Sequence, residues 1–172
     1  MHVHDTSTNM GTLTFMNETP HRLTPEEQHA WRSFVRMNAV LLHRLGHQVQ
    51  VASGLSAADY VVLVELTDVP DGRVRFQDLA RAVEWEKSRM SHHVARMTKR
   101  GLVTREECAE DGRGAFIAIT PAGREAIEVA APTHVGIVRR LFIDLLTPAE
   151  LGVLTQISER VLEQLERDSE TA

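Results

Sequence analysis

The segment SRMSHHVARMTKRGLVTR, residues 88–105, concentrates positive charge in a chain that is otherwise acidic. Extended by one residue to Lys87, it contains six lysines and arginines and no aspartate or glutamate, while the whole chain carries a formal charge of −5. The remaining residues hold 13 basic and 24 acidic side chains, which leaves them at −11. Positive charge confined to one segment predicts contact with a polyanion, and the acidic remainder disfavours unselective binding.

The segment also has the spacing of an amphipathic helix that ends at Gly101. Met90, Val94 and Met97 are four and three residues apart, which predicts an apolar face packed against neighbouring helices. The opposite face is predicted to contact DNA through Ser88, Arg89, Ser91, His92, Arg96 and Lys99, with His93 at its boundary. Arginine and histidine can donate to guanine edges, and serine can reach a base or a phosphate. The alternative is a merely solvated basic face, and the sequence that follows counts against it.

The residues on both sides of this helix indicate a winged helix-turn-helix. Two short helices are predicted over residues 56–66 and 76–84, with Pro70 and Gly72 breaking the chain between them. After the basic helix, the runs LVTREE and AFIAIT are typical of strands, and CAEDGRG between them suits a hairpin turn. The predicted fold class is therefore mainly α, with a two-stranded β wing.

Long helices at both ends of the chain are predicted to form a dimerisation layer. Each begins with a capping box, at Thr24 with Glu27 and at Thr147 with Glu150. Apolar residues then recur at helical spacing, at Trp31, Val35, Leu42, Leu45 and Val49 and again at Leu151, Leu154, Val161 and Leu165. Such stripes suit packing against a second subunit, although packing on each other within one chain stays open.

These elements give an expected domain organisation. We expect a flexible arm at 1–22, a dimerisation helix within 23–55, a DNA-binding domain over 56–120, C-terminal dimerisation helices within 121–168 and a tail at 169–172. A single cysteine fits a reducing cytoplasm. The sequence contains no window of about 18 uninterrupted apolar residues, so no membrane span is expected. No metalloprotease, phosphate-loop or nucleophile-elbow motif is present, so neither an enzyme nor a bound cofactor is expected.

Residues 76–123 resemble the MarR family of bacterial transcription regulators. The motifs that carry the resemblance are ARMTKRGLV at the end of the basic helix, DGRG in the wing and ITPAG at the next helix start, and the resemblance extends from about Leu23 to Leu165. It implies a homodimeric regulator, expected to be a repressor, on a palindromic operator. Each basic helix would enter a major groove and each wing a neighbouring minor groove.

The resemblance also implies roles for individual residues. Arg113 would be the wing arginine in the minor groove, and Asp111 would orient it. Ser91 and His92 occupy positions where relatives often have threonine and arginine, so the histidine departs from the family pattern. Arg96 would anchor a phosphate.

A small-molecule effector, often aromatic or phenolic in this family, is a further implied partner. Its pocket is predicted to involve Trp31, His43, Trp85 and His134. His43 and His47 are spaced to share a metal ion, but no companion ligands are recognisable, and both could instead line a ligand cleft or an interface. A metal-sensing regulator and a winged-helix protein-interaction module without DNA binding are the alternative functions.

Cys108 is the remaining residue with reactive chemistry. Some members of the family sense peroxides through a cysteine, but the neighbouring Glu106, Glu107 and Glu110 disfavour a thiolate. The sequence therefore predicts no redox role for this thiol.

Overall fold

The computed structural model describes residues 22–107 and 114–171, and the chain divides into two units, residues 1–36 and 37–172. The elements are α1 (Pro25–Ser53), α2 (Ala57–Thr67), β1 (Arg73–Arg75), α3 (Phe76–Ala82), α4 (Lys87–Lys99), β2 (Val103–Glu107), β3 (Ala115–Ile119), α5 (Pro121–Leu141), a short 3-10 turn (Ile143–Leu145) and α6 (Pro148–Thr171). In the first unit, the predicted capping box begins α1, because the backbone N–H of Thr24 donates to Glu27 and that of Glu27 donates to Thr24 Oγ1.

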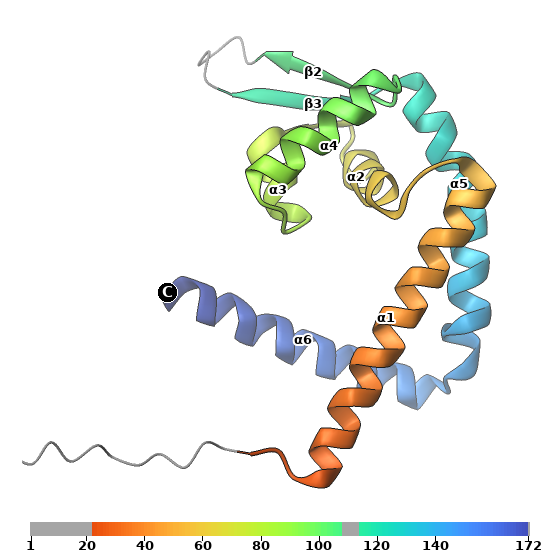
Figure 1. The fold of residues 1–172 in the computed structure, drawn as a ribbon, viewed down its shortest axis with the longest axis vertical. Helices are drawn as coiled ribbons and strands as arrows, with labels where there is room; N and C mark the ends of the chain where they lie inside the picture. Colours follow the sequence, from red (N-terminus) through yellow and green to blue (C-terminus); the bar gives the residue numbers. More distant parts are fainter. Residues whose placement is uncertain (1–21, 108–113, 172) are drawn as a thin grey trace, which may run out of the picture. The chain divides into compact units, whose positions relative to one another are not determined.

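The winged helix-turn-helix is confirmed, with β2 and β3 following α4 as the wing (Figure 1). The sheet contains one more strand than the sequence predicted. β2 and β3 pair antiparallel from Val103 opposite Ile119 to Glu107 opposite Ala115, as the predicted wing requires. β1 pairs with the other edge of β3, which gives the order β1-β3-β2. β1 is not predictable from the sequence, because a three-residue strand is too short to show an alternating pattern.

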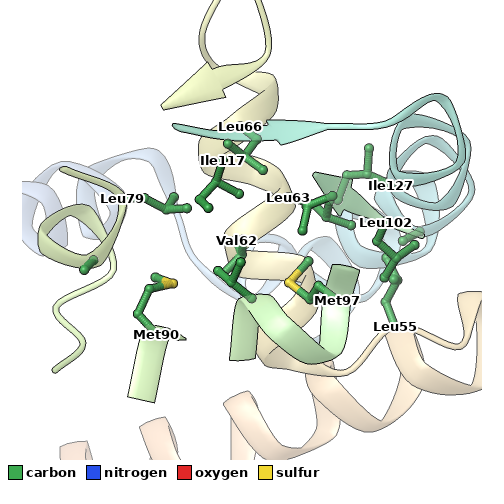
Figure 2. Close-up of a cluster of buried hydrophobic side chains, with 14 of the residues drawn as sticks. Leu55, Val62, Leu63, Leu66, Leu79, Met90, Met97, Leu102, Ile117 and Ile127 are labelled. Carbon is green, nitrogen blue, oxygen red and sulfur yellow. The ribbon is translucent and has the colours of Figure 1, made fainter. Parts of the chain in front are cut away.

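The core of the winged helix fixes which face of α4 is exposed (Figure 2). The predicted apolar face is confirmed, since Met90, Val94 and Met97 are all buried. They pack in one cluster with Val62 and Leu63 of α2, and each such side chain stabilises the fold by about 1.5–3 kcal/mol relative to exposure. Because this face is held inside, the opposite face of α4 must point to solvent.

Gly101 ends α4 as predicted, in a left-handed conformation with φ of 73°. Its N–H donates to the carbonyl of Thr98 at 2.9 Å, and the N–H of Leu102 donates to the carbonyl of Met97 at 3.0 Å. This pair of bonds is the Schellman motif, which glycine favours because it has no Cβ. The turn leads the chain from α4 directly into β2.

The apolar stripes of the terminal helices stay largely exposed in the single chain. In α1, Leu45 and Val49 are buried, whereas Trp31, Val35 and Leu42 are 44–58% exposed. On α6 the exposed apolar residues are Val153, Ile157, Val161, Leu162 and Leu165. No single helix of the described residues is long and apolar enough to cross a membrane; α1 and α2 pass such a test only when taken together across a sharp bend, by length and composition alone.

Thr120 and Gly123 attach the start of α5 to the end of α4. The hydroxyl of Thr120 accepts from the N–H of Gly123 at 3.0 Å and donates to the carbonyl of Gly101 at 2.6 Å. Gly123 itself lies against the carbonyl oxygen of Leu102, which a Cβ would overlap. Glycine at this position therefore allows α5 to approach the backbone that follows α4.

We predict that Gly123→Ala destabilises the protein by about 1–3 kcal/mol, because the added methyl group must displace backbone rather than a side chain. Gly136→Ala in the same helix is the matched control, since a Cβ added there would have no neighbour within 4 Å apart from the backbone of α5 itself. There we expect a gain of up to about 1 kcal/mol from helix propensity alone. Urea unfolding at one protein concentration measures both variants. Equal stability of the two would contradict the close approach.

Candidate nucleic-acid interface

The outward face of α4 presents polar and cationic side chains from every turn of the helix. Ser88, Arg89, Ser91, His92, Arg96 and Lys99 are all exposed. Arg89 lies over the ring of Trp85, with its guanidinium carbon 4.2 Å from the ring centroid. The helix is therefore docked by one face and free on the other, which is the arrangement that entry into a major groove requires.

Asp59, at the start of α2, is the buried anion next to this helix and is 3% exposed. It completes a capping box at the start of α2, since its Oδ2 accepts from the N–H of Ser56 at 2.9 Å and its own N–H donates to Ser56 Oγ at 3.1 Å. Arg100, at the end of α4, donates to the same Oδ2 at 2.6 Å. A second N–H of Arg100 donates to the carbonyl of Gly54 at 2.9 Å.

These contacts determine the charge of Asp59. Burial by itself raises the pKa of this carboxyl, but the contact with His93 and the hydrogen bonds described above hold the pKa well below its usual value. Asp59 is therefore a carboxylate at neutral pH. The pairing of Arg100 was not predictable from the basic segment, because its partner lies 41 residues away along the chain.

His93 is the one predicted contact residue of α4 that does not reach the surface, with 4% of the residue exposed. Its Nε2 lies 3.2 Å from Oδ1 of Asp59, although the pair does not meet in hydrogen-bond geometry, so we treat the contact as electrostatic. Its Nδ1 lies 2.9 Å from Nη2 of Arg96. A buried imidazole cannot contact DNA, so that prediction for His93 is wrong. Helical spacing placed it at the boundary of the two faces, and the carboxylate beneath the helix accounts for its inward position.

The sheet carries three arginines that were not among the predicted contacts. The guanidinium carbons of Arg73 and Arg75 on β1 lie 4.2 and 5.1 Å from the ring centroid of Phe116, and that of Arg105 lies 5.3 Å from the ring of Phe76. Stacking on aromatic rings limits the rotation of these cations. The predicted wing residues Asp111 and Arg113, and Cys108, lie outside the described residues.

A cavity of about 370 Å³ contains two of the four predicted effector residues, Trp85 and His134. The ring of His134 stacks on Tyr60 with centroids 4.6 Å apart, and burial lowers the pKa of His134, which favours a neutral imidazole. The rest of the lining is mostly apolar and comes from Leu42, Leu45, Gly46, Val49, Ala57, Ala58 and Val61, together with Arg89 of α4. The wall of this cavity therefore includes a side chain of α4.

The other two predicted effector residues lie elsewhere. His43 and His47 line a separate, polar cleft of about 470 Å³ with Arg44 and Arg140. Trp31 belongs to the first unit, is 58% exposed and contacts the ring of Phe34. Within the described residues, no group of three or more histidines, cysteines, aspartates and glutamates is placed to hold a metal ion.

Comparison with known proteins identifies the family of this chain. A model of the MarR family matches residues 53–114. The structure is similar to that of AbsC, a MarR family transcriptional regulator from Streptomyces coelicolor, with 42% identity, a TM-score of 0.81 and coverage of 84% of this chain and 97% of AbsC. The chain belongs to the MarR family of transcription regulators.

Two other solved structures extend this comparison. Sco3205, a MarR family regulator from the same organism solved in complex with DNA, has 40% identity and a TM-score of 0.82, and the match covers 85% of this chain and 92% of Sco3205. BpsR from Bordetella bronchiseptica, whose DNA binding is regulated by 6-hydroxynicotinic acid, has 23% identity and a TM-score of 0.66 over 77% of this chain and 98% of BpsR, which shows the fold alone. A search of curated protein sequences found no match.

We predict that Asp59→Asn destabilises this MarR-family protein by about 3 kcal/mol at pH 7, because a buried ion pair loses one partner. The folded-state pKa of Asp59 is depressed, so its stabilising effect is present above the unfolded value of about 3.9 and is lost as the pH falls below it. Urea unfolding at pH 7, 4 and 3 should therefore show the difference between variant and wild type shrinking with acidification. Glu150→Gln, in the exposed capping box of α6, is the control and should have a much smaller effect. A pH-independent difference would contradict the assignment.

Proposed function

We propose that this MarR-family chain is a repressor that binds palindromic operators as a homodimer and releases them when a small molecule binds. The observation that carries the proposal is the exposed cationic face of α4, docked on the core by Met90, Val94 and Met97. The DNA complex of the similar protein Sco3205 supports the DNA-binding part. The rival reading, a protein-interaction module, gives no reason for collecting cations on this face.

In the proposed complex, α4 lies in the major groove. Ser91 and His92 would meet base edges, while Arg96 and Lys99 would bind phosphates. Ser88 and Arg89 would contact DNA at the start of the helix. Arg113, oriented by Asp111, would enter the narrow minor groove from the wing.

The exposed apolar side chains of α1 and α6 support the homodimer. Five apolar residues of α6 are each 46–59% exposed, and a second copy of the chain would remove them from water. A twofold pair of α4 helices, one duplex turn of about 34–36 Å apart, would then read two half-sites on one side of DNA. In this proposal the dimerisation elements are residues 23–55 and 121–168, and the DNA-binding domain is 56–120.

The cavity beside Trp85 supports regulation by a small aromatic acid. Its wall is mostly apolar, a ring could pack beside Tyr60 and His134, and Arg89 supplies the one cation of its lining. A bound carboxylate would compete for Arg89, which otherwise faces DNA, and so would favour the free protein. Regulation of BpsR by 6-hydroxynicotinic acid supports this chemistry by analogy. The metal-sensing alternative is not favoured, because the described residues offer His43 and His47 no third ligand.

DNA binding is tested by selecting bound fragments from random DNA and by gel shifts over a range of salt concentrations. We expect a palindrome bound by two chains. Arg96→Ala and Arg113→Ala should each weaken binding, and Arg96→Ala should lower the salt slope by roughly one for each recognition helix bound. Arg44→Ala, which removes the same charge from α1, is the control. Absence of sequence-selective binding by the wild-type chain would favour the protein-interaction module instead.

Effector control is tested with a panel of hydroxybenzoates and the neutral benzyl alcohol. We expect an acid from this panel to weaken operator binding at least about fivefold, the lower end of typical allosteric coupling. Ala58→Phe should fill the cavity and remove the response while operator affinity without ligand stays unchanged. Gln48→Phe, in the polar cleft beside His43, is the matched control. A response that survives Ala58→Phe but not Gln48→Phe would place the effector in the other cleft.

A further inference from the structure

His93 connects the interior of the winged helix with its DNA-facing surface. One ring nitrogen, Nε2, lies 3.2 Å from the buried carboxylate of Asp59. The other, Nδ1, lies 2.9 Å from Nη2 of Arg96, whose side chain is exposed. A buried ring thus contacts an anion of the core on one side and a surface cation on the other.

The chemistry of the two neighbours selects one form of the ring. A guanidinium group has only donors, so Nδ1 must accept from Arg96 and carries no hydrogen. Asp59 is a carboxylate held by Ser56 and Arg100, so the nitrogen that faces it carries the hydrogen. These two contacts assign the ring hydrogen of His93 to Nε2.

The ring is also prevented from turning. Trp85 meets His93 edge to face with centroids 5.2 Å apart, and the ring is almost wholly buried. Asp59 cannot shift to follow the ring, because its other oxygen is held by the α2 cap and by Arg100 at 2.6 Å. The lone pair of Nδ1 therefore points in a fixed direction from the core toward the surface.

We propose that Asp59 and His93 form a positioning relay that sets the direction of the Arg96 guanidinium for DNA. The inference rests on the proposed function, because it gives Arg96 its ligand. Among the described residues, the side chain of Arg96 has this one hydrogen-bond partner, so its other N–H groups stay available to a phosphate or a base. Holding a long side chain before binding lowers the ordering cost when DNA arrives.

Lys99 provides the internal comparison. It lies one turn after Arg96 on the same exposed face, and it has no hydrogen-bond or ion-pair partner among the described residues. We therefore expect changes at His93 to act on DNA binding through Arg96 and not through Lys99. A purely structural role for His93 would affect both cations alike.

Two substitutions separate the two contacts of the ring. His93→Gln keeps a donor near the position of Nε2 for Asp59 and removes the acceptor for Arg96. His93→Asn keeps an oxygen near the position of Nδ1 for Arg96 and removes the nitrogen that faces Asp59. We expect His93→Gln to raise the operator Kd about fivefold for each recognition helix bound, the fold-change of one lost hydrogen bond, with near wild-type stability. His93→Asn should bind more tightly than His93→Gln, although it is less stable toward urea.

The double-mutant cycle decides between positioning and structure. In an Arg96→Ala background, His93→Gln should cause no further loss of affinity, whereas in a Lys99→Ala background it should still raise the Kd about fivefold for each recognition helix bound. Equal losses in the two backgrounds, or wild-type affinity for His93→Gln, would overturn the relay.

Nitrogen NMR of the histidine rings tests the relay without DNA. The wild-type spectrum should show His93 with a hydrogen on Nε2 and none on Nδ1, and a hydrogen on Nδ1 would overturn the proposal even if the substituted proteins fail to fold. Failure of the wild-type chain to bind any DNA would instead refute the proposed function, and the ring spectrum would still decide the relay.

Discussion

The geometry of α4 depends on the buried carboxylate of Asp59. One oxygen closes the capping box of α2 and receives Arg100 from the end of α4, and the other faces His93 from the middle of α4. A buried charge is costly unless it is paired, so this carboxylate requires α4 to lie at one position along α2. Apolar packing alone would hold the helix against the core without defining that position so narrowly.

The positive segment consequently contains cations of different kinds. Arg100 is used inside the fold, Arg96 is held by the core while its guanidinium reaches the surface, and Lys99 is unrestrained by the described residues. The charge of the segment therefore overstates what DNA could meet directly. The sequence does predict correctly that the positive charge of α4 faces solvent, because three buried apolar residues fix the opposite face of the helix in the core.

One aromatic residue, Trp85, contacts both the cavity and side chains of α4. Trp85 lines the cavity, supports the guanidinium of Arg89 and meets the ring of His93 edge to face. A ligand that displaced this indole would disturb two cations of α4 through direct contact. Binding at the cavity and the geometry of α4 thus share a physical link, and no longer pathway through the protein is needed.

Local chemistry determined most of the fold from the sequence alone. Periodic apolar residues, the T-P-x-E caps and Gly101 predicted the helices and the wing because each depends on neighbours a few residues away. The exposed face of α4 followed from the same periodicity. His93 could not be placed this way, because its inward position depends on Asp59, which lies 34 residues earlier in the chain.

The contacts of the candidate sites were decided by tertiary structure. Trp85 and His134 were predicted together and do line one cavity. His43 lines another cleft, because it points to a different side of α1 from Leu42 and Leu45, which line the cavity. The role of Arg100 and the pairing of β1 likewise depend on residues about 40 positions away. Sequence spacing defines the face of an element, and only the folded chain defines what that face meets.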